Sequence, residues 1–150
     1  MVDLRNIVKV AEEGEGVWAP WEEDETVAFK IAYMGRELLR RVRRKSVVKT
    51  VNPKTKRIEE DINEDILDKE LMASSLVGWR GLKLKHLNSL LDPSVTITFD
   101  GDPEAEVPFT PENKEILLNC FNLAFSRFIS GVSADAETYR KLREQSLEKN

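Results

Sequence analysis

The sequence predicts a helix-dominated α+β domain, with about four helices and a small antiparallel sheet. Several long segments repeat apolar residues at three- and four-residue spacing, as amphipathic helices do, and two short segments alternate apolar and polar residues with the period of a strand. Helices and strands do not follow a regular βαβ order. The two strands would therefore pair antiparallel across a long separation in sequence.

Length and composition favour one soluble globular domain of ordinary type. The chain has 150 residues, of which 41% are hydrophobic and 33% charged, and its net charge of −4 argues against a dedicated nucleic-acid binder. Cys120 is the only cysteine, so we expect a core thiol and a reducing compartment. The charges of Asp3 and Arg5 argue against a secretory signal peptide at the N-terminus, and no apolar run is long enough to cross a bilayer. A cytoplasmic location is expected.

The charge pattern divides the chain into three parts. Residues 1–25 are rich in glutamate around Gly14, Gly16 and Pro20, which is typical of a flexible acidic lead, here with tryptophans that can anchor it. Residues 26–132 are expected to form a single α+β domain. Residues 133–150 are expected to form a polar C-terminal helix that packs on the domain or on a partner.

In the first half, the alternation of Thr26 to Tyr33 predicts a strand. Met34 to Lys45 places apolar residues at four-residue spacing among arginines, which predicts a basic amphipathic helix of about three turns. Residues 46–51 and 57–62 flank the turn signal Asn52-Pro53-Lys54-Thr55, so we expect a short hairpin.

A further helix is predicted from Asn63, which can cap it, to Gly78, which would end it. The leucine-rich segment after Gly81 can form a short helix. Val95 to Phe99 alternates with threonines and is followed by Asp100-Gly101, so it is predicted as the second strand.

The clearest local signal is the start of a long helix at Pro111. Thr110 can cap it, proline suits the first helical position, and Phe109 is placed to staple onto the apolar face that follows. The helix should run to about Ser130 and stop at Gly131, and Ser133 can cap the last helix.

Enzyme chemistry finds little support. His86 is the only histidine, and a surface or packing role is favoured because a catalytic or metal site needs convergent partners. The carboxylates at residues 59–65 surround the start of a helix, where the helix dipole stabilises acidic side chains. The spacing of Asp92, Asp100 and Asp102 does not match a calcium-binding loop. Since the phosphate-binding, zinc-protease and serine-hydrolase motifs are absent, we expect no enzyme activity, no cofactor and no metal.

Residues 36–57 carry many cations against a single acid, Glu37. They are Arg36, Arg40, Arg41, Arg43, Arg44, Lys45, Lys49, Lys54, Lys56 and Arg57. Three interpretations remain open: a solvated face or one neutralised by the chain's own acidic lead, a surface for an acidic protein partner, and a phosphate-binding surface for nucleic acid.

Three segments together resemble the tail assembly chaperones encoded beside the tape measure gene of long-tailed phages and prophages. They are Val27 to Arg41, Gly78-Trp79-Arg80-Gly81-Leu82, and Val107-Pro-Phe-Thr-Pro-Glu-Asn113 before a long helix. In that family a short acidic loop often joins the last two, whereas here residues 83–103 intervene.

The resemblance implies a non-catalytic protein of the host cell cytoplasm that binds the tape measure protein, keeps its apolar helices from aggregating and helps tail tube subunits gather. An apolar groove would hold the client and charged patches would select it. The candidate residues are Trp79, Phe109, Phe121, Phe125 and Phe128 as core or groove, and Arg40, Arg43 and Arg44 as a charged contact surface. The wide apolar helix also suggests a homo-oligomer. The competing hypothesis is a nucleic-acid-binding regulator that uses the basic helix Arg36 to Lys45.

Overall fold

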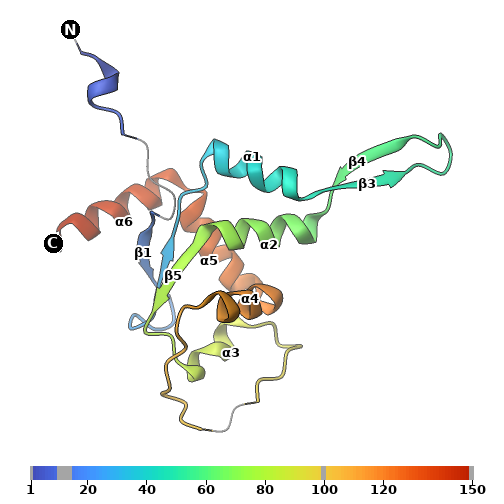
Figure 1. Cartoon of the computed structure of the whole chain (residues 1–150). Helices are drawn as coiled ribbons and strands as arrows, with labels where there is room; N and C mark the ends of the chain where they lie inside the picture. Colours follow the sequence, from blue (N-terminus) through green and yellow to red (C-terminus); the bar gives the residue numbers. More distant parts are fainter. Residues whose placement is uncertain (1, 10–14, 99–100, 149–150) are drawn as a thin grey trace.

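A computed structural model describes residues 2–9, 15–98 and 101–148, and within them it confirms the α+β class (Figure 1). The described residues form six α-helices, so the expected number of four was too low. The elements are β1 (Val17–Pro20), β2 (Ala28–Ile31), α1 (Arg36–Lys45), β3 (Val47–Val51), β4 (Ile58–Ile62), α2 (Glu64–Ser75), β5 (Leu76–Arg80), α3 (Leu87–Leu90), α4 (Pro111–Cys120), α5 (Leu123–Ser133) and α6 (Ala136–Glu148). Short 3-10 turns lie at Leu4–Asn6 and Leu84–His86.

The main sheet has three antiparallel strands in the order β1-β2-β5. The central strand β2 is the predicted first strand, and in it Phe29 pairs with Ala19 on one side and with Trp79 on the other. The predicted partner at residues 95–99 is wrong for residues 95–98, which belong to no strand, and residue 99 lies outside the described residues. The alternation of apolar and polar residues was not enough to predict a strand here, because a strand forms only where a sheet edge is available to pair with it.

Residues 17–25, which the sequence places in the acidic lead, contain β1 and the buried Trp21. Val17 and Ala19 are buried on β1, and the Trp21 amide donates to the Val27 carbonyl at 2.8 Å. The Trp21 ring lies 4.9 Å from that of Phe128, with the two rings nearly perpendicular. The domain therefore includes residues 17–25, and the tryptophan provides much of their burial.

An aromatic cluster from three parts of the chain lies at the centre of the core. Phe29 and Phe125 are fully buried with ring centroids 4.9 Å apart, and Trp21 packs against both. Apolar residues of α2, α4 and α5 complete this core. The sheet is thereby fixed to the helices that follow it.

The long helix predicted from Pro111 is two helices, because the backbone is extended at Phe121 and Asn122 caps a second helix. The Asn122 side chain accepts from the Phe125 amide, which caps α5, and donates to the Ser89 carbonyl. Backbone bonds from Asp92 to Cys120 and from Asn122 to Leu90 complete the junction. The segment before α4 thus replaces the helical hydrogen bonds lost at the break.

Three helix ends also differ from the prediction. Gly78 does not end α2: the helix ends at Ser75, and Gly78 lies inside β5 against the Lys30 side chain. Gly131 lies within α5 rather than after it. Asp135, not Ser133, caps α6, since its carboxylate accepts from the amides of residues 137 and 138. The caps predicted at Asn63 and Thr110 are confirmed.

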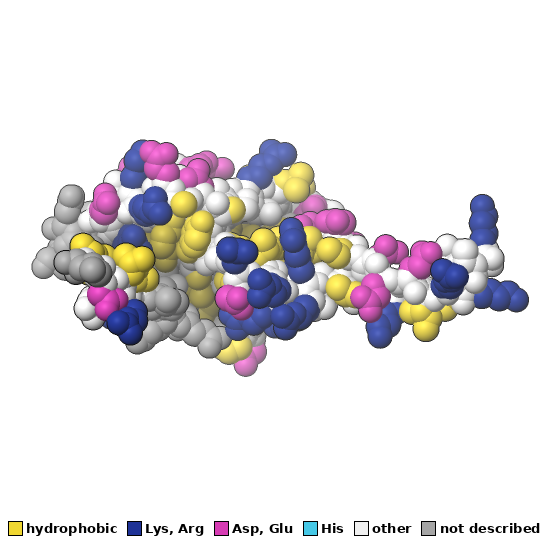
Figure 2. All heavy atoms as spheres, turned by 90° about the horizontal axis from the view of Figure 1, so that it is seen from above, with side chains coloured by type: hydrophobic (Ala, Val, Ile, Leu, Met, Phe, Trp, Pro, Cys, Tyr) yellow, Lys and Arg dark blue, Asp and Glu magenta, His cyan; other side chains and the backbone are white. Residues whose placement is uncertain are grey.

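The β3–β4 hairpin projects from the body of the molecule beyond the end of α1, as Figures 1 and 2 both show. This confirms the hairpin predicted at residues 46–62 and its turn at residues 52–55. We call β3, β4 and their turn the arm.

Candidate functional site

The arm exposes a largely apolar face to solvent. Its register pairs Val47 with Ile62 and Val51 with Ile58, and because side chains alternate along a strand, these four lie on one face, with the pair Lys49 and Glu60 between them. Val51 is 65% exposed and Ile58 is 70% exposed. A two-stranded hairpin buries little surface of its own and is marginally stable in isolation, so such exposure is typical of a surface that a partner covers.

The arginine face lies on α1, at the base of the arm. It consists of Arg36, Arg40, Arg43 and Arg44, which stay exposed while Val42 is buried beneath the helix. Arg40 pairs with Glu37 at 3.1 Å. The other three form no ion pair with any residue in the described part of the chain. Their charge is therefore available to a partner.

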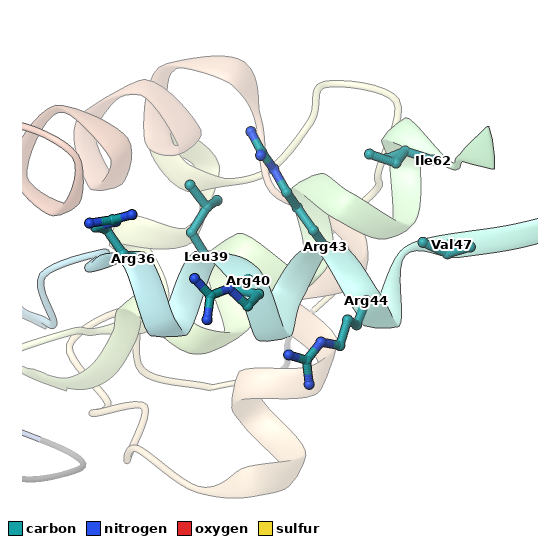
Figure 3. Close-up of a pocket in the computed structure, with 7 residues that line it drawn as sticks. All are labelled: Arg36, Leu39, Arg40, Arg43, Arg44, Val47 and Ile62. Carbon is teal, nitrogen blue, oxygen red and sulfur yellow. The ribbon is translucent and has the colours of Figure 1, made fainter. Parts of the chain in front are cut away.

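The arm and the arginine face meet at one shallow cavity of about 390 Å³ (Figure 3). The four arginines line it together with Leu39, Val47 and Ile62. In Figure 3, Arg36, Leu39 and Arg43 extend toward one side of α1 and Arg44 toward the other, Val47 follows the C-terminal end of the helix, and Ile62 lies above its last turn. The cavity is thus lined by both apolar side chains and arginines.

The segments that carry the resemblance come together around Trp79. Its indole N–H donates to the Val107 carbonyl at 2.7 Å, and its ring lies 4.7 Å from that of Phe109. The Val107 amide donates to the Leu82 carbonyl at 2.7 Å. Phe109 therefore packs on Trp79, and its neighbour on α4 is the Lys114 ammonium, 5.8 Å from the ring centre.

The predicted aromatic residues do not form one open groove. Phe125 is fully buried and Trp79 is 6% exposed, so neither can contact a client while the domain is folded. Phe121 and Phe128 are partly buried against the core, and Phe109 is 38% exposed. Of the predicted contact residues, Arg40, Arg43 and Arg44 lie together at a cavity, and the aromatic residues support the fold.

A second hollow, of about 300 Å³, lies beside His86. His86 Nε2 is 2.8 Å from the Asp24 carboxylate, and Nδ1 accepts from the Lys83 amide. Hydrogen bonds from the Thr26 hydroxyl and amide, and then from His86, lower the pKa of Asp24. Both imidazole nitrogens are thus engaged in holding residues 24–26 against residues 83–86, which is the packing role predicted for this histidine.

The remaining candidates also have local partners. The Cys120 thiol donates to the Ile116 carbonyl, and partial burial raises its pKa, so the thiolate is disfavoured. Within the described ranges, no group of three or more metal-ligating side chains is arranged to hold an ion. None of the helices described is both long and apolar enough to span a membrane.

Comparisons with protein-family models, with curated proteins and with solved structures gave no match to this chain.

The sequence reasoning missed the apolar residues of the arm, although their signal was present. Val47, Lys49 and Val51 alternate with Val48 and Thr50, and Ile58 and Ile62 show the same two-residue period. Once the hairpin is predicted, this period places Val47, Val51, Ile58 and Ile62 on one face. Their exposure follows from the projection of the arm, which no local pattern encodes.

Proposed function

We propose that this chain is a non-catalytic binding protein that holds a segment of a client protein on the arm and the arginine face. The observation that carries the proposal is the exposed apolar face of the arm, whose residues Val47 and Ile62 line one cavity together with arginines of α1. Burial of such a face releases free energy on binding, and the charges select which partner is accepted.

We further propose that the client class is the one implied by the resemblance. The chain would act as a phage tail assembly chaperone, with the tape measure protein as client and the tail tube protein as a possible second partner. Support comes from the meeting of all three resembling segments: Trp79 joins Val107 and Phe109, and it pairs with Phe29 of the first segment. The host cell cytoplasm is the proposed location.

Co-expression with a tape measure protein encoded beside this chain tests the proposal. The tape measure protein should remain soluble and co-purify with the chain. The variant Val51→Ser with Ile58→Ser should lose co-purification, and because both residues are exposed, its unfolding temperature should change little. A tape measure protein that aggregates equally with and without the chain would refute the proposal.

Self-association is part of the proposal, since exposed apolar side chains also lie away from the arm. Ile116 on α4 is 63% exposed and Leu123 on α5 is 71% exposed. Light scattering should detect oligomers at micromolar concentration. A strict monomer across that range would remove this part of the proposal.

The alternative is a nucleic-acid-binding regulator that uses Arg36 to Lys45. Arg36, Arg43 and Arg44 form no ion pair with a described residue, which favours this alternative because guanidinium groups bind phosphates well. Such binding should weaken steeply as salt rises, since each phosphate contact releases counterions. Absence of binding to DNA and RNA at low salt would dispose of this alternative.

A further inference from the structure

We propose that the arm and the arginine face bind an acidic amphipathic helix of about 20 residues. This inference rests on the proposed function and names the chemistry of the client segment. Its apolar side would lie on Leu39 and the apolar face of the arm. Its carboxylates would lie against the arginine face.

The dimensions of the surface support a helical ligand of this length. The ten residues of α1 span about 15 Å at 1.5 Å per residue. The five-residue strands of the arm add about 17 Å at 3.3 Å per residue. Figure 1 shows the arm continuing outward from the C-terminal end of α1. A surface of roughly 30 Å matches a helix of about 20 residues.

The charge of the surface specifies an acidic ligand. Arg36, Arg43 and Arg44 line the cavity and form no ion pair with a residue in the described ranges. Arginine forms two parallel hydrogen bonds with a carboxylate, so it suits glutamate and aspartate side chains spaced along a helix. The nearby Lys45 is already 3.8 Å from Glu70 of α2, so among the described residues Arg36, Arg43 and Arg44 are the cations of the cavity without an ion pair.

The arm favours a protein ligand over nucleic acid. Glu59, Glu60 and Asp61 are exposed on β4, and Glu60 shares the apolar face because it lies between Ile58 and Ile62. Lys49 is the register partner of Glu60, so this pair carries no net charge, and the isoleucines and valines on either side of it offer no hydrogen bonds to a polynucleotide backbone. An amphipathic helix satisfies both parts of the surface, because it has an apolar stripe and a charged flank.

Fluorescence anisotropy with labelled synthetic peptides tests this inference on the full chain. The first peptide has about 21 residues, with leucine at the a and d positions of its heptads and glutamate or glutamine elsewhere. The second replaces every glutamate by lysine. The acidic peptide should bind at least about tenfold more tightly than the basic one at physiological salt, because the arginines attract only the first.

Paired variants locate the site. Arg36→Glu with Arg43→Glu should weaken binding of the acidic peptide roughly tenfold, since both guanidinium groups face the cavity. The matched control is Arg127→Glu with Arg140→Glu, which makes the same change of net charge at exposed residues of α5 and α6. The control should keep the affinity within about twofold. Circular dichroism should show that both variants remain folded.

Three outcomes would overturn the inference. They are failure of the acidic peptide to bind more tightly than the basic one, equal loss in the two variants, and tighter binding of a DNA duplex of about 20 base pairs than of the acidic peptide at the same salt. If the tape measure protein co-purifies but the acidic peptide fails to bind, the helix inference falls and the proposed function stands. If neither binds, both fall.

Discussion

Gly81 should tolerate no side chain, and replacing it by alanine is the sharpest test of the sheet. Its φ is +71°, a conformation that costs an L-residue about 1–2 kcal/mol. An added Cβ would lie 2.1 Å from the Thr26 carbonyl oxygen, far inside ordinary contact. The backbone around Thr26, just before β2, would have to shift to make room for the methyl group. Overpacking of this kind costs about 1–3 kcal/mol.

The two contributions together predict that Gly81→Ala lowers the free energy of unfolding by about 2–5 kcal/mol. For a domain of this size, the unfolding temperature should fall by about 5–15 °C. Thermal unfolding followed by circular dichroism measures the shift, and urea unfolding gives the free energy.

Gly131→Ala is the matched control, because it makes the same chemical change in a different environment. Gly131 lies in α5, and an added Cβ would meet no atom within 4 Å. Alanine should stabilise the helix by about 0.5–1 kcal/mol and raise the unfolding temperature by about 1–4 °C. An unchanged or raised unfolding temperature in Gly81→Ala would refute the geometry assigned to Gly81.

Three further substitutions test other parts of the fold. Phe125→Ala should cost about 3–5 kcal/mol in urea unfolding because the ring is fully buried, whereas a loss below about 1 kcal/mol would place it outside the core. Asn122→Ala should cost about 1–3 kcal/mol, since it removes the cap of α5 and a hydrogen bond to Ser89; an unchanged unfolding temperature would favour one continuous helix. Glu104→Gln should flatten the acid dependence of stability: its two lysine partners lower the carboxyl pKa from 4.5 to about 2, so its contribution is present above pH 4.5 and is lost as pH falls toward 2. Unfolding curves measured from pH 7 to pH 2 should show that the free energy of unfolding falls more steeply with acid in the unchanged chain than in Glu104→Gln.

Some helix ends and turns that depend only on residues close in sequence were predicted correctly. The caps at Asn63 and Thr110 and the turn of the arm follow from side-chain chemistry within a few residues, and they are correct. The partner strands of β2 were missed because pairing is a long-range choice. Leu76 to Arg80 continues directly from a helix, and Val17 to Pro20 follows a run of acids that resembles a flexible lead.

The break between α4 and α5 shows a different limit. Residues 116–129 keep an apolar pattern through Phe121 and Asn122, so periodicity alone predicts one helix. The break is stabilised by Ser89, Leu90 and Asp92, which are distant in sequence and supply the hydrogen bonds that the helix gives up. Asn122 was the available signal, since asparagine is a strong N-cap and weak in a helix interior.

The candidate site was predicted in part, and the reason lies in what each residue does. The arginines were recognisable as candidate contact residues because a local excess of positive charge can be read from the sequence. Buried and exposed aromatic residues have the same sequence pattern, so only the fold distinguishes them. Trp79 and Phe125 build the core, so their loss should destabilise the domain and weaken any binding indirectly. Val51 and Ile58 contribute little to the core, so their loss should abolish binding while the fold persists. Measuring stability and binding on the same variants therefore separates the residues that maintain the fold from those that contact the partner.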